Sequence, residues 1–150
     1  MHSLPKPRAE LVLGEAAAEG KANDKDLGQT GGALNVCSYS AANRPIKFAN
    51  VSVWQANPNS TAQWNAQTFW TTLKSGSKSL SEQRPGGSFQ ALSGMGEDGY
   101  IESWPAGTIG ATEIHVLNGD LIIGARVPGQ GAAAVEQAKG IVSVLMVRKS

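Results

Sequence analysis

The segment that most constrains this fold is residues 111–127, which read ATEIHVLNGDLIIGARV. The Asn-Gly pair at 118–119 is the preferred two-residue turn of a β-hairpin, because both central positions of that turn need a positive φ. A turn at this point also fixes which residues of the two strands lie opposite one another. The expected facing pairs are Val116 with Leu121 and Ile114 with Ile123.

This hairpin is predicted to have one apolar and one polar face, because successive side chains of a strand point to opposite sides. The apolar face is predicted to consist of Ile114, Val116, Leu121, Ile123, Ala125 and Val127. The polar face is predicted to carry Glu113, His115 and Arg126. An amphipathic helix over residues 132–147 follows at once, and we expect it to cover the apolar face.

Hydrophobic periodicity and turn residues divide the rest of the chain into further helices and strands. The predicted helices span residues 4–18 and 61–74, and the predicted strands span 35–40, 46–55, 89–92 and 99–104. Residues 57–60 form a cap cluster before the second helix. Two long connections are predicted to be loops, a polar one over 20–33 and an exposed, mobile one over 74–87.

The resulting element order is α-β-β-α-β-β-β-β-α, in which strands 35–40 and 46–55 are expected to form an antiparallel hairpin. The sequence therefore predicts a single α+β domain over residues 1–150, with the helices packed on one face of an antiparallel sheet. Residues 1–3 are interpreted as a remnant of a linker or of an added start.

Composition excludes several classes of function. The 13 basic and 12 acidic residues nearly balance, and no basic stripe appears, so nucleic acid is not expected as a partner. No apolar run reaches the roughly 20 residues that span a membrane. The single cysteine, Cys37, cannot form an internal disulfide. It is interpreted either as a small buried hydrophobe or as a nucleophile, although no motif supplies a basic partner for the second role.

Three short motifs resemble catalytic or ligand-binding signatures, and none has the context that its chemistry needs. Gly94 to Gly99 matches G-x-G-x-x-G, but a strand rather than a helix is predicted to follow, so a tight strand connection is favoured. Residues 75–78 match S-x-x-K without its companion motifs. Asp24 and Asp26 lack the further acidic ligands of a calcium loop. The sequence therefore predicts no catalytic residues, no metal and no cofactor.

Aromatic residues away from the expected core faces are the candidates for a binding surface. On the helix over 61–74, Trp64 points nearly opposite the apolar stripe. It either packs under a neighbouring loop or serves as an exposed anchor for a partner, because tryptophan is enriched at binding hot spots. Trp54 is compatible with a buried position and with an exposed one. The candidate ligand-binding or partner-binding residues are Trp54, Trp64, Lys74, Lys78 and His115.

His115 also has a possible chemical role. It is the only histidine outside the start of the chain, and Glu113 lies two residues away on the same predicted face. The pair is either the acid-base centre of a small hydrolase or an ordinary surface or sheet-packing pair. Metal ligation by His115 and Cys37 stays open, although two scattered residues are a poor zinc pattern.

The motifs resemble those of a family of small bacterial exported lipoproteins of unknown function. Residues 4–15 look like the family's opening helix, which ends in Leu-Gly-Glu. Residues 35–39 are similar to its Cys-x-Tyr strand, and residues 94–100 resemble its Gly-x-Gly-Asp/Glu-x-x-Tyr turn. The resemblance implies an exported α+β domain that a lipid tethers to a membrane in its full-length form. Family members often carry a cysteine before the first helix that could pair with the one at Cys37, where this chain has His2-Ser3.

Three functional hypotheses follow. The first is a non-enzymatic, exported or envelope-associated binding domain for a protein, glycan or lipid. The second is a small hydrolase or ligand-modifying enzyme that uses His115 with Glu113. The third is a structural component of an envelope or secretion complex. The expected location is the cell envelope or periplasm, with the cytoplasm as the alternative.

Overall fold

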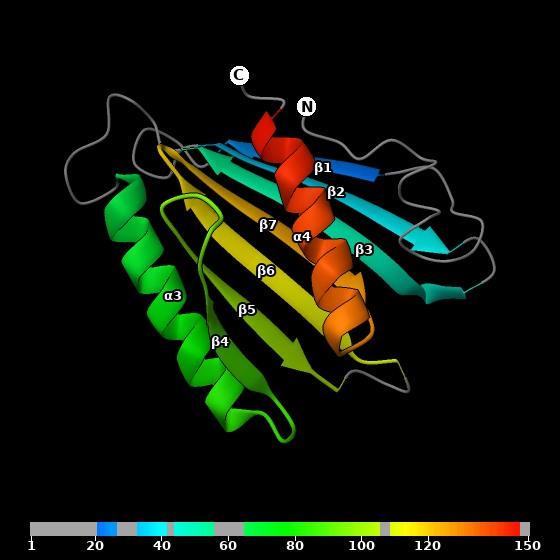
Figure 1. Cartoon of the computed structure of the whole chain (residues 1–150). Coiled ribbons are helices and arrows are strands. Elements are labelled where there is room, and N and C mark those ends of the chain that lie inside the picture. Colours follow the sequence, from blue (N-terminus) through cyan, green and yellow to red (C-terminus); the bar gives the residue numbers. More distant parts are fainter. Residues whose placement is uncertain (1–20, 27–32, 42–43, 56–64, 106–108, 148–150) are drawn as a thin grey trace.

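The computed structural model describes residues 21–26, 33–41, 44–55, 65–105 and 109–147, which form seven strands and two helices. The strands are β1 (Lys21–Asp26), β2 (Ala33–Ala41), β3 (Arg44–Gln55), β4 (Ser88–Leu92), β5 (Asp98–Trp104), β6 (Ala111–Asn118) and β7 (Leu121–Pro128). The helices are α3 (Ala66–Gln83) and α4 (Ala132–Val147). The strands form one sheet in the order β1-β2-β3-β7-β6-β5-β4 (Figure 1).

Every neighbouring pair in this sheet is antiparallel, and the β6–β7 hairpin lies at its centre. The outer side of β7 pairs with β3, and the outer side of β6 pairs with β5. The predicted α+β class, the β2–β3 hairpin and the central hairpin are therefore confirmed. The central position of β6 and β7 agrees with their near-continuous burial, because both faces of both strands are covered.

The predicted pairing within the central hairpin is wrong. Val116 lies opposite Ile123 and Ile114 opposite Ala125, because the turn residues are Gly119 and Asp120 rather than 118–119. Gly119 has φ +64° and no described residue other than glycine has a positive φ, as in a turn with glycine at its first central position. The partner of each β6 residue lies two positions further along β7 than predicted, and a shift of two leaves every side chain on its predicted face. The predicted apolar and polar faces are thus confirmed.

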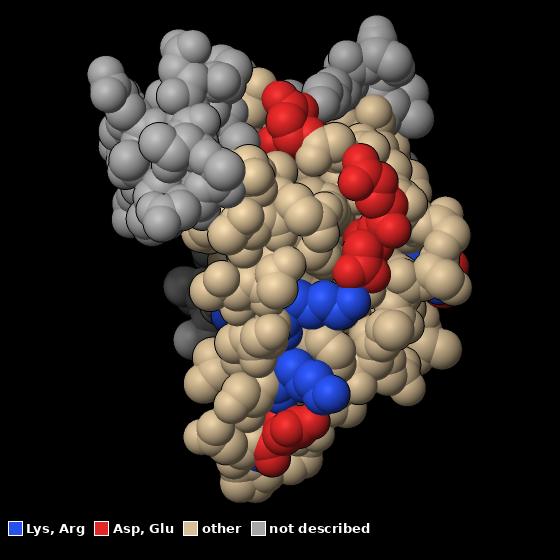
Figure 2. Space-filling view, turned by 90° about the vertical axis from the view of Figure 1, so that its left-hand side faces the viewer, with Lys and Arg blue, Asp and Glu red and all other residues tan. Residues whose placement is uncertain are grey.

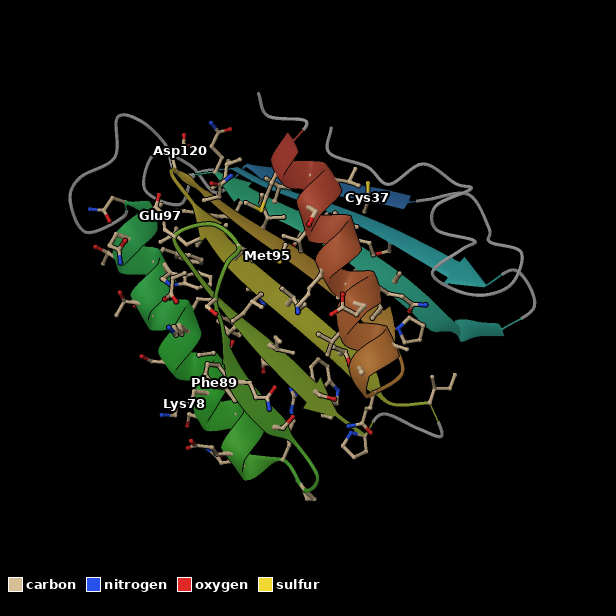
Figure 3. All side chains as sticks on the ribbon, in the orientation of Figure 1. Cys37, Lys78, Phe89, Met95, Glu97 and Asp120 are labelled. Atoms are coloured by element: carbon tan, nitrogen blue, oxygen red, sulfur yellow. The ribbon has the colours of Figure 1, made fainter. Side chains whose placement is uncertain are left out.

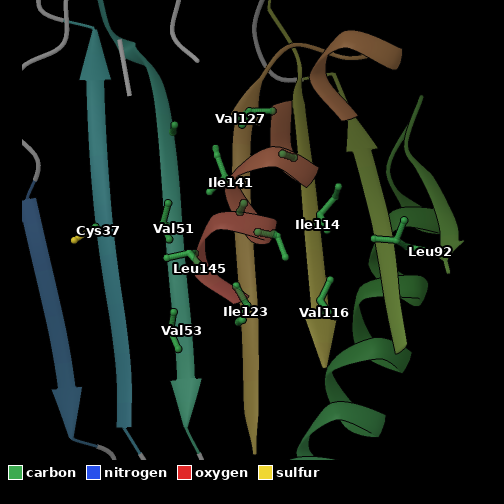
Figure 4. Packing of buried hydrophobic residues seen from close by; sticks show 14 of the residues in the cluster. Cys37, Val51, Val53, Leu92, Ile114, Val116, Ile123, Val127, Ile141 and Leu145 are labelled. Atoms are coloured by element: carbon green, nitrogen blue, oxygen red, sulfur yellow. The ribbon is translucent and has the colours of Figure 1, made fainter. Parts of the chain in front are cut away.

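One face of the sheet packs against α4, whose bounds match the predicted helix (Figure 4). Its buried residues are Ala134, Ala138, Ile141, Val142 and Leu145. They contact the apolar face of the central hairpin together with Val51, Val53 and Cys37. Cys37 is only 2% exposed within this cluster, so its interpretation as a small buried hydrophobe is confirmed.

The other face packs against α3, so the expectation that the helices share one face is wrong for the two described helices. This second core consists of Trp54, Ala66, Trp70, Tyr100, Leu117 and Ile122, with Phe69, Leu73 and Phe89 packed beside it. Trp54 stacks on Phe69 with 4.5 Å between the ring centroids. Both faces of the sheet carry large apolar side chains, and each face therefore needs its own cover.

The bounds of α3 differ from the predicted helix at both ends. The side chain of Asn65 caps its start by accepting a hydrogen bond from the Thr68 backbone N–H at 2.8 Å. The helix then continues to Gln83, so the prediction of a mobile loop over 74–87 is wrong for most of that range. The Ser- and Gly-rich sequence reads as a loop by propensity alone, and contacts with β5 override that preference.

Residues 21–26 correct the other predicted loop, since they form β1 along the edge of β2. The sequence of β1, KANDKD, has no apolar alternation, so its strand character follows from its backbone pairing with β2. The predicted helix over 4–18, the cap cluster at 57–60 and Trp64 lie outside the described residues.

The glycine-rich motif connects β4 to β5, which confirms the tight strand connection. Gly96 has φ +60°, and a Cβ there would lie 2.4 Å from the Leu117 carbonyl oxygen. Glu97 makes two hydrogen bonds to the turn between β6 and β7. Its backbone N–H donates to the Leu117 carbonyl oxygen, and its carboxylate accepts from the Gly119 N–H, both at 2.9 Å. Glu97 and Asp120 lie at the same end of the sheet (Figure 3).

Candidate functional site

Two rows of polar side chains cross the strands on the α3 side of the sheet. Register places Asn50, Arg126, Glu113 and Glu102 in the first row, on β3, β7, β6 and β5 in turn. The second row runs through Ser52, Gly124, His115 and Tyr100 on the same four strands. Neighbouring residues of a row belong to adjacent strands, which lie about 4.8 Å apart.

At the β5 end of both rows, the side chains contact α3. Ser81 donates a hydrogen bond to the buried Glu102 carboxylate at 2.7 Å, and Ser77 lies 2.9 Å from the Tyr100 hydroxyl. Burial raises the pKa of Tyr100, which therefore stays neutral. Through these pairs the polar side of α3 contacts the β5 members of the two rows. The remaining members of the rows lie on β6, β7 and β3.

Lys74 and Trp70 extend the contacts of α3 toward the end of β5. The Lys74 ammonium and the Trp70 indole N–H lie 2.7 and 2.9 Å from one Asp98 carboxylate oxygen. These two hydrogen bonds, that of Lys74 above all, hold the pKa of Asp98 below its ordinary value. Lys74 therefore has a structural partner, which differs from the role proposed for it from the sequence.

His115 is largely covered by its neighbours. Its side chain is 12% exposed, its Nε2 lies 3.3 Å from Glu113 Oε1, and its ring centroid is 5.2 Å from that of Tyr100. Burial lowers the pKa of His115 to about 4, so the imidazole is neutral at neutral pH. Nδ1 is buried without a hydrogen-bond partner. A base with this pKa lies far from the ideal for proton transfer near pH 7.

Glu113 and Arg126 carry the opposite charges of the first row. Burial raises the pKa of Glu113, and the positive charge of Arg126 partly offsets that rise. The Arg126 guanidinium lies over the Trp104 ring, 4.9 Å from its centroid, and Arg84 contacts the same ring at 4.8 Å. Trp104 therefore orients the cation that faces Glu113.

A cavity of about 150 Å³ lies over β7, between the side chains of β3 and β6. It is lined by Val36, Asn50, Ser52, Glu113, Gly124, Ala125 and Arg126. Gly124 forms its floor, and the side chains of Ser52 and His115 approach that glycine so closely that a Cβ there would lie 2.5 Å from Ser52 Oγ and 2.9 Å from His115 Nε2. Asn50 Oδ1 in its wall is buried without a hydrogen-bond partner. Such an acceptor costs free energy until a donor reaches it.

The structure brings His115 together with Glu113, as the sequence suggests, but separates Trp54, Lys74 and Lys78 from that pair. Trp54 is 3% exposed and belongs to the α3-side core. Lys78 is exposed on the outer side of α3, directed away from the sheet (Figure 3). Cys37 lies in the core on the opposite face from His115, so these two residues do not form a metal site. No group of three potential metal ligands gathers among the residues that the structure describes.

Sequence reasoning missed every lining residue of the cavity except Glu113, and the polar ones among those missed are Asn50, Ser52 and Arg126. Alternation along β3 places Asn50 and Ser52 on the face opposite Val51 and Val53, which was a usable signal. The pairing of β3 with β7, on which the cavity depends, is not encoded in any local pattern.

The molecular surface carries charges of both signs on the face seen from the side of α3 (Figure 2). No helix in the described part of the chain is long and apolar enough to cross a membrane.

Comparison with known proteins identifies a similar fold. No protein-family model and no curated protein matches the sequence. The structure is similar to the crystal structure of the extracellular domain of PknH from Mycobacterium tuberculosis, with a TM-score of 0.60 and 11% sequence identity. The similarity covers 97% of this chain and 91% of the other. At this identity the match supports a shared α+β fold.

Proposed function

We propose that this protein is a non-enzymatic, exported accessory domain that binds a small ligand in the cavity on the α3 side of the sheet. The observation that carries the proposal is the cavity itself, which combines opposite charges, a glycine in its floor and the unpartnered Asn50 Oδ1. A concave site with a few convergent polar groups and shifted pKa values is the usual form of a ligand site. The binding surface predicted around Trp54, Trp64 and residues 74–87 is replaced by this cavity.

Export of the domain is a separate part of the proposal. It is supported by the similarity to an extracellular domain and by the resemblance to exported lipoproteins. Fractionation of cells that produce the native protein should recover it with the envelope, and recovery with the cytosol would reject this part.

The ligand-binding function is tested by a thermal-shift screen of amino acids, sugars, carboxylates, amines and fatty acids. A ligand at 100 times its dissociation constant stabilises a protein by about 2.7 kcal/mol, which raises Tm by several degrees. The Gly124→Ala variant places a methyl group in the cavity floor and should abolish the shift. Gly76→Ala is the matched control, because a Cβ at Gly76 meets nothing within 4 Å.

A hit that shifts the wild type and the Gly76→Ala variant, but not Gly124→Ala, supports the function. If Gly124→Ala is too unstable to test, the amide resonance of Gly124 in the wild type should move when the hit is added. A screen with no hit that meets either criterion rejects this cavity as a ligand site.

The hydrolase hypothesis receives less support from the same residues. His115 contacts Glu113 through Nε2, and its depressed pKa makes it a weak base. The role of a structural component of an envelope or secretion complex stays a prediction.

A further inference from the structure

The walls of the cavity include one acidic and one basic residue on adjacent strands. Glu113 on β6 and Arg126 on β7 are direct register partners, and both line the cavity. Their backbones are therefore about one strand spacing apart, roughly 4.8 Å. A small anion in this space is attracted by Arg126 and repelled by Glu113, and a small cation meets the reverse arrangement. A ligand that carries both charges is attracted by both residues.

The neutral groups of the cavity define where each charge of the ligand would lie. Asn50 Oδ1 is an acceptor without a partner and needs a donor, such as a proton of an ammonium group. Ser52 adds a hydroxyl that can donate to a carboxylate. His115, which borders the floor at Gly124, is neutral and adds no third charge.

Size limits the ligand further. An apolar cavity of similar volume in another protein holds benzene, a molecule of about six heavy atoms. The volume of about 150 Å³ is therefore too small to enclose a lipid chain, an oligosaccharide or a peptide. Val36 is the apolar side chain of the lining, because the Ala125 methyl group lies in the α4-side core, and Val36 suits a short aliphatic group.

We propose that the cavity binds a small zwitterion, a short aliphatic α-amino acid of the size of alanine. Its carboxylate lies toward Arg126 and Ser52, and its ammonium group lies toward Glu113 and Asn50 Oδ1. The inference rests on the proposed function and specifies its ligand class.

The first test uses the wild-type protein and three matched probes in calorimetric titrations. L-alanine carries both charges, L-alaninamide keeps only the ammonium, and N-acetyl-L-alanine keeps only the carboxylate. Loss of one charge-assisted contact should weaken binding about tenfold to a hundredfold. We expect L-alanine to bind and both blocked analogues to bind at least about tenfold more weakly.

The second test compares two arginines that contact the same ring. Arg126→Gln removes the cation from the cavity, whereas Arg84→Gln removes the other guanidinium on Trp104, which does not line it. Arg126→Gln should weaken L-alanine binding about tenfold or more, and Arg84→Gln should leave it within about twofold.

The outcomes separate this inference from the proposed function. Equal binding of L-alanine and either blocked analogue, or no binding of L-alanine, overturns the zwitterion. A sugar or a simple anion that binds in a manner dependent on Gly124 would overturn it as well, and would leave the cavity standing as a ligand site. The proposed function and the zwitterion inference are both rejected only if no ligand binds in a manner that depends on Gly124.

Discussion

At the scale of single residues, the sheet keeps a neutral imidazole next to a carboxylate in a buried position. The ordinary pKa of a histidine is 6.5, and burial lowers that of His115 to about 4. Between these two values the unfolded chain holds more protons than the folded one, so stability is lost as the pH falls through this window. The raised pKa of Glu113 acts in the opposite direction, because it makes stability fall as the pH rises above the ordinary value.

This balance predicts how acid affects the protein. Lowering the pH from 7 to 5 should reduce the free energy of unfolding by at most about 2 kcal/mol, the contribution of His115 alone, from which the opposite contribution of Glu113 subtracts. The His115→Gln variant, which keeps an N–H group for Glu113, should lose most of that dependence. Urea unfolding of both proteins at the two pH values measures the difference. His2 is present in both and cancels, so an equal drop in the variant would contradict the prediction.

Residue patterns along the strands predicted the faces of these side chains but not their burial. Alternation placed Glu113, His115 and Arg126 on one face, and register confirms it. The burial of His115 was not predictable, because it depends on Tyr100 and on Gly124, which belong to different strands. A local pattern reports which face a side chain is on and not what covers that face.

At the scale of elements, α3 is held by side chains that a propensity scale counts against a helix. Ser77 and Ser81 point at Tyr100 and Glu102, and Gly76 lies between them and the first turns of the helix. Serine in a helix interior is neutral to unfavourable unless its hydroxyl finds a partner. Here the partners lie on β5, so the helix depends on the sheet for its full length.

Removing one of these hydroxyls should therefore destabilise the protein. Ser81→Ala leaves the Glu102 carboxylate, 6% exposed, without its hydrogen-bond donor. A buried acceptor deprived of its partner costs about 1–3 kcal/mol. Ser79→Ala on the exposed side of the same helix is the control and should change stability by about 0.5 kcal/mol or less. Urea denaturation of the two variants should separate them, and equal stabilities would show that the Ser81 contact is dispensable.

At the scale of the whole molecule, one sheet serves two cores. Alternate residues of β6 and β7 contribute to the α4 side and to the α3 side, as Ile123 and Ile122 illustrate. The cores therefore share a backbone, and loss of either should unfold both.

This sharing predicts cooperative unfolding. Ile141→Ala, in the α4-side core, should lower stability by about 2–5 kcal/mol because it leaves a cavity in a fully buried position. Tryptophan fluorescence reports on all four tryptophans, of which Trp54 and Trp70 lie in the opposite core, whereas far-UV circular dichroism reports on all elements. Both probes should shift to the same lower urea midpoint. An unchanged fluorescence transition would mean that the two sides unfold independently. Leu80→Ala, at a side chain 54% exposed, is the control.

The sequence by itself determined the features that depend on neighbours along the chain. Period-two alternation fixed the faces of β3, β6 and β7, the glycine-rich connection fixed the step from β4 to β5, and a helical period fixed α4. Tertiary structure decided the length of α3, the strand character of β1 and the division of the helices between the two faces. It also decided the cavity, because that site joins residues from β2, β3, β6 and β7. Their contact follows from the pairing of β3 with β7, whose strands are far apart in the sequence and meet only when the sheet has formed.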